Sequence, residues 1–175
     1  VGLEVAHRCT VHSYVRGWKL LSEADVSPHT EDQVLAILVE LLRTLTWLHG
    51  LPDPVVHGAI RPVNIVRREL DRRLVLLDFM GVRDAIRGGS PSPTPLDPGY
   101  NAPEQVLDWP ASPATDLWAL GALCVRLLSG RDPSELWDGT ELRWQPHVFA
   151  SADLLLLLSD LLQVDPSRRP SHASD

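Results

Sequence analysis

Cysteine is scarce in this 175-residue sequence, and long apolar runs are absent. The two cysteines, Cys9 and Cys124, are too few and too far apart for a disulfide framework. Cys124 lies in an apolar stretch, where a buried free thiol is expected. No apolar run reaches the roughly 18 residues that a membrane-spanning helix needs, and no secretory signal opens the chain. We therefore expect a cytoplasmic protein without a membrane partner.

Basic residues are fewer than acidic ones. Lys and Arg total 16 against 23 Asp and Glu, which gives a net charge of −7. Binding to nucleic-acid phosphates needs concentrated positive charge. The one local basic cluster (Arg67, Arg68, Arg72 and Arg73) is explained by a solvated turn between two strands, so no nucleic-acid partner is expected. The hydrophobic fraction of 44% is that of an ordinary globular protein, and the length favours one domain.

One helix is predicted with both of its ends. Thr30 followed three residues later by Gln33 is typical of an N-terminal capping box. Apolar residues at positions 34, 38, 41, 45 and 48 then follow a helical stripe. Gly50 is expected to end the helix.

The remaining elements are predicted from shorter patterns. Residues 116–128 are apolar on nearly every side, which is typical of a helix at the centre of a domain. A shorter helix is expected over 154–162, and two strands over 65–66 and 74–77. A strand over 11–15 and a turn at 16–18 are expected near the start. Residues 88–98, rich in Gly, Ser and Pro, are interpreted as an internal loop.

Seven sequence motifs occur in the order found in one enzyme family. The chain resembles the C-terminal lobe of a eukaryotic-type Ser/Thr protein kinase. The motifs are YVRGWKL (14–20), TLTWLHG (44–50), HGAIRPVNIV (57–66), LLDFMG (76–81), GYNAPEQ (99–105), ATDLWALGALCVRLLSG (114–130) and DPSRRPS (165–171). The resemblance implies an α+β, mainly α fold with short β-hairpins around the catalytic-loop region. Residues 1–20 would be a remnant strand and hinge-like segment, and 21–175 the lobe.

The resemblance also implies structural anchors. Glu104 would form a buried ion pair with Arg169, although two separate surface charges remain the alternative. Asp116 would accept hydrogen bonds from backbone N–H groups of the catalytic loop, or would cap its own helix. His57 and Phe79 would stack in the hydrophobic spine of the family, which differs little from ordinary core packing.

The catalytic loop departs from the family pattern. Ala59 stands in place of the catalytic Asp that accepts the proton of the acceptor hydroxyl. Gly58 replaces the preceding Arg, and Arg61 replaces the catalytic-loop Lys. Met80 stands where the family's D-F-G motif has glycine. The chemistry of the loop is therefore expected to be degenerate, while its architecture remains.

Two family Mg²⁺ ligands are retained, at Asn64 and Asp78. No glycine-rich phosphate loop and no lysine of a V-A-I-K motif precede residues 14–20, so most of the N-terminal lobe that the resemblance implies is missing from these residues. Asn64 and Asp78 could still bind a metal with nucleotide, but Mg²⁺ sites of this kind need the phosphates as ligands. The alternative is that both residues persist as hydrogen-bonding parts of the loop.

These observations favour a catalytically inactive pseudokinase module, which is not an enzyme and binds no cofactor. Its expected role is that of a protein-interaction or regulatory scaffold. Its partner would be another protein or a second copy, at the apolar surface that an N-terminal lobe covers. The alternative is an atypical Ser/Thr phosphotransferase or a nucleotide-binding switch that uses ATP and Mg²⁺. Its N-terminal lobe would come from another chain or from outside these residues.

Overall fold

The computed structural model describes residues 14–21, 27–79 and 97–174. Met80, most of the strand expected over 11–15 and most of the loop expected over 88–98 lie outside the described residues. The first 13 residues of the expected N-terminal segment also lie outside them. Within these ranges, no helix is long and apolar enough to cross a bilayer.

The predicted first helix is confirmed as α1 (Glu31–His49). The Thr30 hydroxyl accepts from the Gln33 backbone N–H, and the Gln33 side chain accepts from the Thr30 N–H. Gly50 follows the last helical residue and donates its N–H to the carbonyl of Thr46. Both ends therefore follow from the capping chemistry that the sequence contains.

Three short antiparallel strands form one sheet in the order β1–β2–β3. They are β1 (Gly17–Lys19), β2 (Ile65–Arg68) and β3 (Leu74–Leu76). The two predicted strands over 65–66 and 74–77 are confirmed, but the turn predicted at 16–18 is wrong. Gly17 pairs with Arg68, and a Cβ atom at Gly17 would lie 2.3 Å from the Arg67 carbonyl oxygen. The glycine permits a close approach of two strands here rather than a turn.

The apolar helix α4 (Pro113–Ser129) begins three residues earlier than predicted. Pro113 occupies its first turn, and the Ser112 N–H donates to the Thr115 hydroxyl at 3.0 Å. Asp116 is therefore not the N-cap, which leaves its carboxylate available for another element. The predicted C-terminal helix is confirmed as α6 (Ala152–Leu161).

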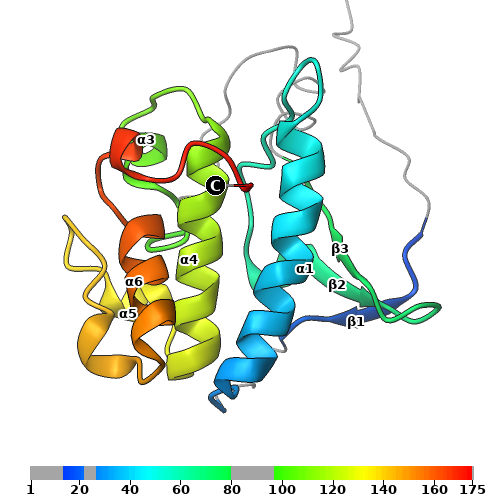
Figure 1. Cartoon of the computed structure of the whole chain (residues 1–175), viewed down its shortest axis with the longest axis horizontal. Coiled ribbons are helices and arrows are strands. Elements are labelled where there is room, and N and C mark those ends of the chain that lie inside the picture. Colours follow the sequence, from blue (N-terminus) through cyan, green and yellow to red (C-terminus); the bar gives the residue numbers. More distant parts are fainter. Residues whose placement is uncertain (1–13, 22–26, 80–96, 175) are drawn as a thin grey trace, which may run out of the picture.

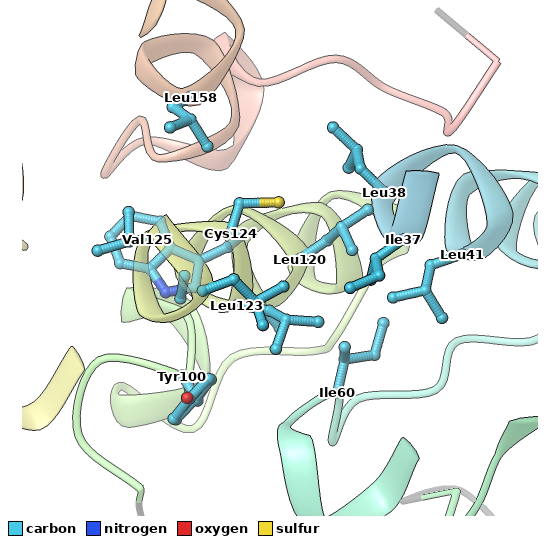
Figure 2. Close-up of a cluster of buried hydrophobic side chains, with 14 of the residues drawn as sticks. Ile37, Leu38, Leu41, Ile60, Tyr100, Leu120, Leu123, Cys124, Val125 and Leu158 are labelled. Carbon is cyan, nitrogen blue, oxygen red and sulfur yellow. The ribbon is translucent and has the colours of Figure 1, made fainter. Parts of the chain in front are cut away.

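Helix α4 lies at the centre of the molecule. Figure 1 shows α1 on one side of it and α6 on the other, with the sheet beyond α1. Figure 2 shows Leu120, Leu123 and Cys124 of α4 amid side chains from both neighbouring helices and from the loop residue Ile60. Burial raises the pKa of the Cys124 thiol to about 12. The helical majority with one small sheet agrees with the predicted mainly α, α+β class.

Short helical segments complete the fold and were not predicted. They are α3 (Pro103–Val106), α5 (Pro133–Leu136), and the 3-10 turns η1 (Pro62–Asn64), η2 (Gln145–His147) and η3 (Pro166–Arg168). Each has a proline in its first two positions, where its fixed φ favours helix initiation and its missing N–H leaves no bond unmade.

Candidate active site

The loop over residues 57–64 is attached to the centre of the molecule by Asp116. The Asp116 carboxylate accepts the backbone N–H of His57 at 2.8 Å and that of Gly58 at 2.7 Å. His49, at the end of α1, places its Nε2 3.0 Å from the same carboxylate. All these groups are buried, Gly58 included. The loop is thereby fixed to both α4 and α1.

Gly58 has φ of +71°, in the left-handed region that favours glycine. An Arg there would adopt this backbone only at a cost, so the local conformation accounts for the glycine. The Gly58 carbonyl accepts from the Gln105 side chain of α3 at 2.9 Å. Contacts to Asp116 and Gln105 thus fix both polar backbone groups of this residue.

Ala59 takes part in the loop through its backbone alone. Its N–H donates to His57 Nδ1 at 3.2 Å, and its carbonyl accepts from Asn64 Nδ2 at 2.8 Å. The His57 ring lies 4.3 Å from the ring of Phe79, centroid to centroid. Burial lowers the pKa of His57, although Asp116 opposes this effect, so the ring favours its neutral form.

Asn64 and Asp78 are brought together by the register of the sheet. Ile65 pairs with Leu76, and the Leu77 N–H continues the ladder to the Asn64 carbonyl at 2.8 Å. Asp78 follows directly, so two oxygen-bearing side chains flank the same end of β2 and β3. Because Asn64 Nδ2 is engaged by Ala59, its Oδ1 is the atom left to face a cation.

Asp78 is exposed and has φ of +63°, which is uncommon for a residue with a side chain. Asp and Asn tolerate this conformation best, and such backbone strain concentrates at functional sites. Among the residues described, no three His, Cys, Asp or Glu side chains group to hold a metal ion. Asn64 and Asp78 therefore suit Mg²⁺ that arrives with phosphate ligands rather than a cation held by protein alone.

Arg61 supplies positive charge on the same loop as Asn64, whose backbone N–H donates to the Arg61 carbonyl at 3.0 Å. Its Nη1 lies 2.9 Å from Asp97 Oδ2. Its Nε is buried and has no hydrogen-bond partner among the described residues. A guanidinium with an unused donor is suited to an anionic oxygen such as that of a phosphate.

A cavity of about 380 Å³ opens next to the loop and is lined in part by Arg61, Val63, Asp97 and Tyr100. Tyr100 is only 5% exposed, and its hydroxyl has no partner in the described part of the chain. Burial raises the pKa of Tyr100 well above its usual range, and nearby Asp132 and Asp97 raise it further. The phenol is therefore a protonated donor at the cavity wall.

Glu104 and Arg169 form a bidentate ion pair in the interior. The two oxygens of Glu104 lie 2.8 Å from Nη1 and Nη2 of Arg169. The Thr115 hydroxyl donates to Glu104 at 2.9 Å, and the guanidinium lies 5.1 Å from the centre of the Trp118 ring. Burial alone would raise the pKa of Glu104, but the bonds from Arg169 and Thr115 lower it overall.

Sequence reasoning did not single out Asp97, Tyr100 or Gln105. Asp97 closes a stretch rich in Pro and Ser, whose composition indicates only a loop. Its proximity to Arg61 joins residues 36 positions apart. Only the folded backbone brings such residues together, so no local signal could have found this contact.

Comparison with known proteins gives a consistent result. A family model described as the protein kinase domain matches residues 4–174. Serine/threonine-protein kinase B of Synechocystis sp. is 31% identical over 173 residues, which cover 91% of this chain and 30% of that protein. Serine/threonine-protein kinase D of the same organism is 32% identical over 174 residues, which cover 93% and 33%. The chain thus spans about a third of these relatives.

The fold also matches solved structures. The kinase domain of Mycobacterium tuberculosis PknI superposes with a TM-score of 0.64 at 23% identity. The match covers 91% of this chain and 60% of that chain. The protein kinase-like fold implied by the sequence motifs is therefore confirmed.

The same comparisons correct our functional prediction. The relatives that cover most of this chain are named as Ser/Thr protein kinases, so the prediction of a catalytically inactive scaffold that is not an enzyme is wrong. The prediction gave too much weight to Ala59. Removal of one general base lowers a rate by about 10²–10⁴-fold and leaves the other contributions in place. The expectation of no cofactor rested on the same reasoning and is withdrawn with it.

Proposed function

The chain belongs to the protein kinase family, and from this premise we propose that it forms the large-lobe part of a Ser/Thr phosphotransferase. Its substrates would be ATP, with Mg²⁺, and a protein hydroxyl. Phosphoryl transfer depends mainly on positioning and on electrostatic stabilisation of the phosphate oxygens. The described residues retain groups suited to both tasks.

The juxtaposition of Asn64 and Asp78 carries this proposal. The Leu77–Asn64 backbone hydrogen bond sets the two side chains at one end of the β2–β3 ladder. A bound Mg²⁺ would neutralise charge on the phosphates. The amide oxygen of Asn64 and the carboxylate of Asp78 would hold it there, with the phosphates completing its coordination.

Arg61 supports the same function. Its buried Nε lacks a partner among the described residues and would donate to a phosphate oxygen. Arg61 belongs to the loop that Asp116 fixes through His57 and Gly58. The Arg61 guanidinium is therefore held in a set position before substrate arrives, which is the condition for effective electrostatic stabilisation.

The covering of the nucleotide is also part of the proposal. We assign residues 21–175 to the C-terminal lobe and residues 14–20 to the connection with a smaller lobe from another chain or from polypeptide outside these residues. The 60% coverage of the solved kinase domain supports this assignment. Trp18 of β1 and Val63 of η1, both exposed and on elements in contact, would meet that lobe.

Titration with ATP by calorimetry, with and without Mg²⁺, tests the site. Asp78→Asn is the informative variant, because Asn tolerates the left-handed backbone while the carboxylate is lost. We expect Mg²⁺-dependent binding, and transfer of the γ-phosphoryl group to Ser or Thr, to be lost in this variant.

Asp108→Asn is the matched control. Asp108 also has positive φ (+59°) and is exposed, but it follows α3 and does not line the cavity beside the loop. Its substitution should leave both measurements unchanged. Mg²⁺-dependent binding that survives Asp78→Asn would contradict the assigned metal site, and absence of phosphoryl transfer by the unaltered protein would contradict the proposed activity.

A further inference from the structure

We propose that Asp97 accepts the proton of the acceptor hydroxyl, in place of the carboxylate that the catalytic loop lacks at Ala59. This inference rests on the proposed phosphotransferase function and names the base for that reaction. It assigns a catalytic group to a residue outside the loop.

Ala59 and Asp97 line the same small pocket. Its wall also includes Gly58, Arg61 and Asn101, and no other carboxylate lies among the residues described there. Ala59 comes from the catalytic loop, whereas Asp97 comes from the turn that precedes α3. A carboxylate is therefore present beside position 59, although it enters from a different segment of the chain.

The Asp97 carboxylate has one engaged oxygen and one available oxygen. Oδ2 lies 2.9 Å from Arg61 Nη1. Oδ1 has no hydrogen-bond partner within the described ranges, and the side chain is 34% exposed. Arg61 thus holds the carboxylate by one oxygen, which leaves Oδ1 to take a proton.

The backbone around Asp97 is ordered by several hydrogen bonds. The Asp97 N–H donates to Asn101 Oδ1 at 2.7 Å, and its carbonyl accepts the N–H groups of Tyr100 and Asn101, each at 3.1 Å. The Trp118 indole of α4 donates to the Gly99 carbonyl at 3.0 Å. The turn is thus attached to the central helix, so the carboxylate is positioned before substrate binds.

Space for the acceptor adjoins this carboxylate. The cavity of about 380 Å³ is also lined by Arg61, Asp97 and Tyr100, so it borders the small pocket. The Tyr100 hydroxyl is buried without a partner in the part of the chain described. A hydroxyl-bearing side chain in this cavity would find a donor in Tyr100 and an acceptor in Asp97.

The reaction step then balances. The acceptor oxygen forms a bond to the γ-phosphorus, and the bond from that phosphorus to the β–γ bridging oxygen breaks. The bond's electron pair leaves with ADP. The hydroxyl proton passes to Oδ1 of Asp97, while Arg61 remains on Oδ2. A proton acceptor of this kind contributes about 10²–10⁴-fold to such a reaction.

The test is a mutant cycle on the full protein, with the rate of phosphoryl transfer from Mg²⁺–ATP and the affinity for Mg²⁺–ATP measured separately. Asp97→Asn keeps the size of the side chain and its bond to Arg61. We expect it to lower the transfer rate by about 10²–10⁴-fold, with nucleotide affinity unchanged. In the Ala59→Asp background, the loop regains a carboxylate, and Asp97→Asn should then leave the rate unchanged.

Glu69→Gln is the matched control. Glu69 is also a partly exposed carboxylate paired with an arginine, Arg16, but it lies in the turn between β2 and β3. It should not alter transfer. A transfer rate in Asp97→Asn equal to that of the unaltered protein would overturn the inference while leaving the phosphotransferase proposal in place. Absence of transfer in the unaltered protein would overturn both. A large loss in the Ala59→Asp background would assign Asp97 a structural role and also overturn it.

Discussion

Replacement of Arg169 by Met should strongly destabilise the fold. Arg169 is 4% exposed and donates to both oxygens of Glu104. It also donates to the backbone carbonyls of Ala114, Gln163 and Val164, at 2.9, 2.7 and 3.1 Å. Met fills similar space without any donor, so Glu104 keeps only its bond from the Thr115 hydroxyl and the three carbonyls lose the guanidinium as a donor.

The expected loss of stability comes mainly from the Glu104 charge that Arg169→Met leaves without its ion-pair partner. Removal of one partner from a buried ion pair leaves an uncompensated charge and costs about 3–5 kcal/mol. Each buried carbonyl that loses its donor adds about 1–3 kcal/mol unless water reaches it. We therefore expect Arg169→Met to lower the free energy of unfolding by at least about 3 kcal/mol, which is a large part of the stability of a typical domain.

Urea denaturation monitored by tryptophan fluorescence measures this loss, as a lower midpoint at an unchanged slope. Arg16→Met is the control, because Arg16 pairs with Glu69 on the surface and is 81% exposed in its side chain. Its substitution should change stability by only about 0–1 kcal/mol. A loss for Arg169→Met as small as that of the control would refute the reasoning.

Two further changes test other features of the fold. Burial lowers the pKa of His57, so the unfolded chain takes up its proton first as the pH falls below about 6.5. We therefore expect the free energy of unfolding to decrease as the pH is lowered through that range, and His57→Phe to reduce this decrease. Denaturation midpoints measured at several pH values test this, and the same pH dependence in the variant and the unaltered protein would contradict it. Gly99 has φ of +90°, and a Cβ there would lie 2.7 Å from backbone atoms of Pro133, whereas Gly139 has φ of +99° and open space around it. Both Ala variants introduce backbone strain, but Gly99→Ala should lower the free energy of unfolding by about 1–3 kcal/mol more than Gly139→Ala does. Equal losses of unfolding free energy in the two variants would contradict the importance of the contact with Pro133.

The local elements were predictable where short-range chemistry determines them. The Thr30–Gln33 capping box and Gly50 specify both ends of α1 within the segment itself. Strand β1 was not predicted correctly, because Gly17 is required there by the close approach of the Arg67 backbone on the neighbouring strand. The glycine alone is equally typical of a turn, so only the partner strand distinguishes the two structures.

The residues of the site also differ in how far the sequence alone could identify them. Asn64 and Asp78 belong to motifs that could be identified from their neighbours, whereas Asp97 gains its meaning from Arg61, 36 residues away. The start of α4 shows the intermediate case. Ser112 and Thr115 extend the helix by one turn, and this places Asp116 inside the helix, with its carboxylate on the catalytic loop rather than on its own N-terminus.

The backbone-only role of Ala59 has a consequence for how this site can change over generations. Contacts of Asp116, Asn64 and Gln105 determine the path of the loop, and none of them involves the Ala59 side chain. The shape of the loop and its reactivity are thus encoded at different positions. A single substitution at position 59 can therefore add or remove a reactive side chain without touching the hydrogen bonds that hold the loop.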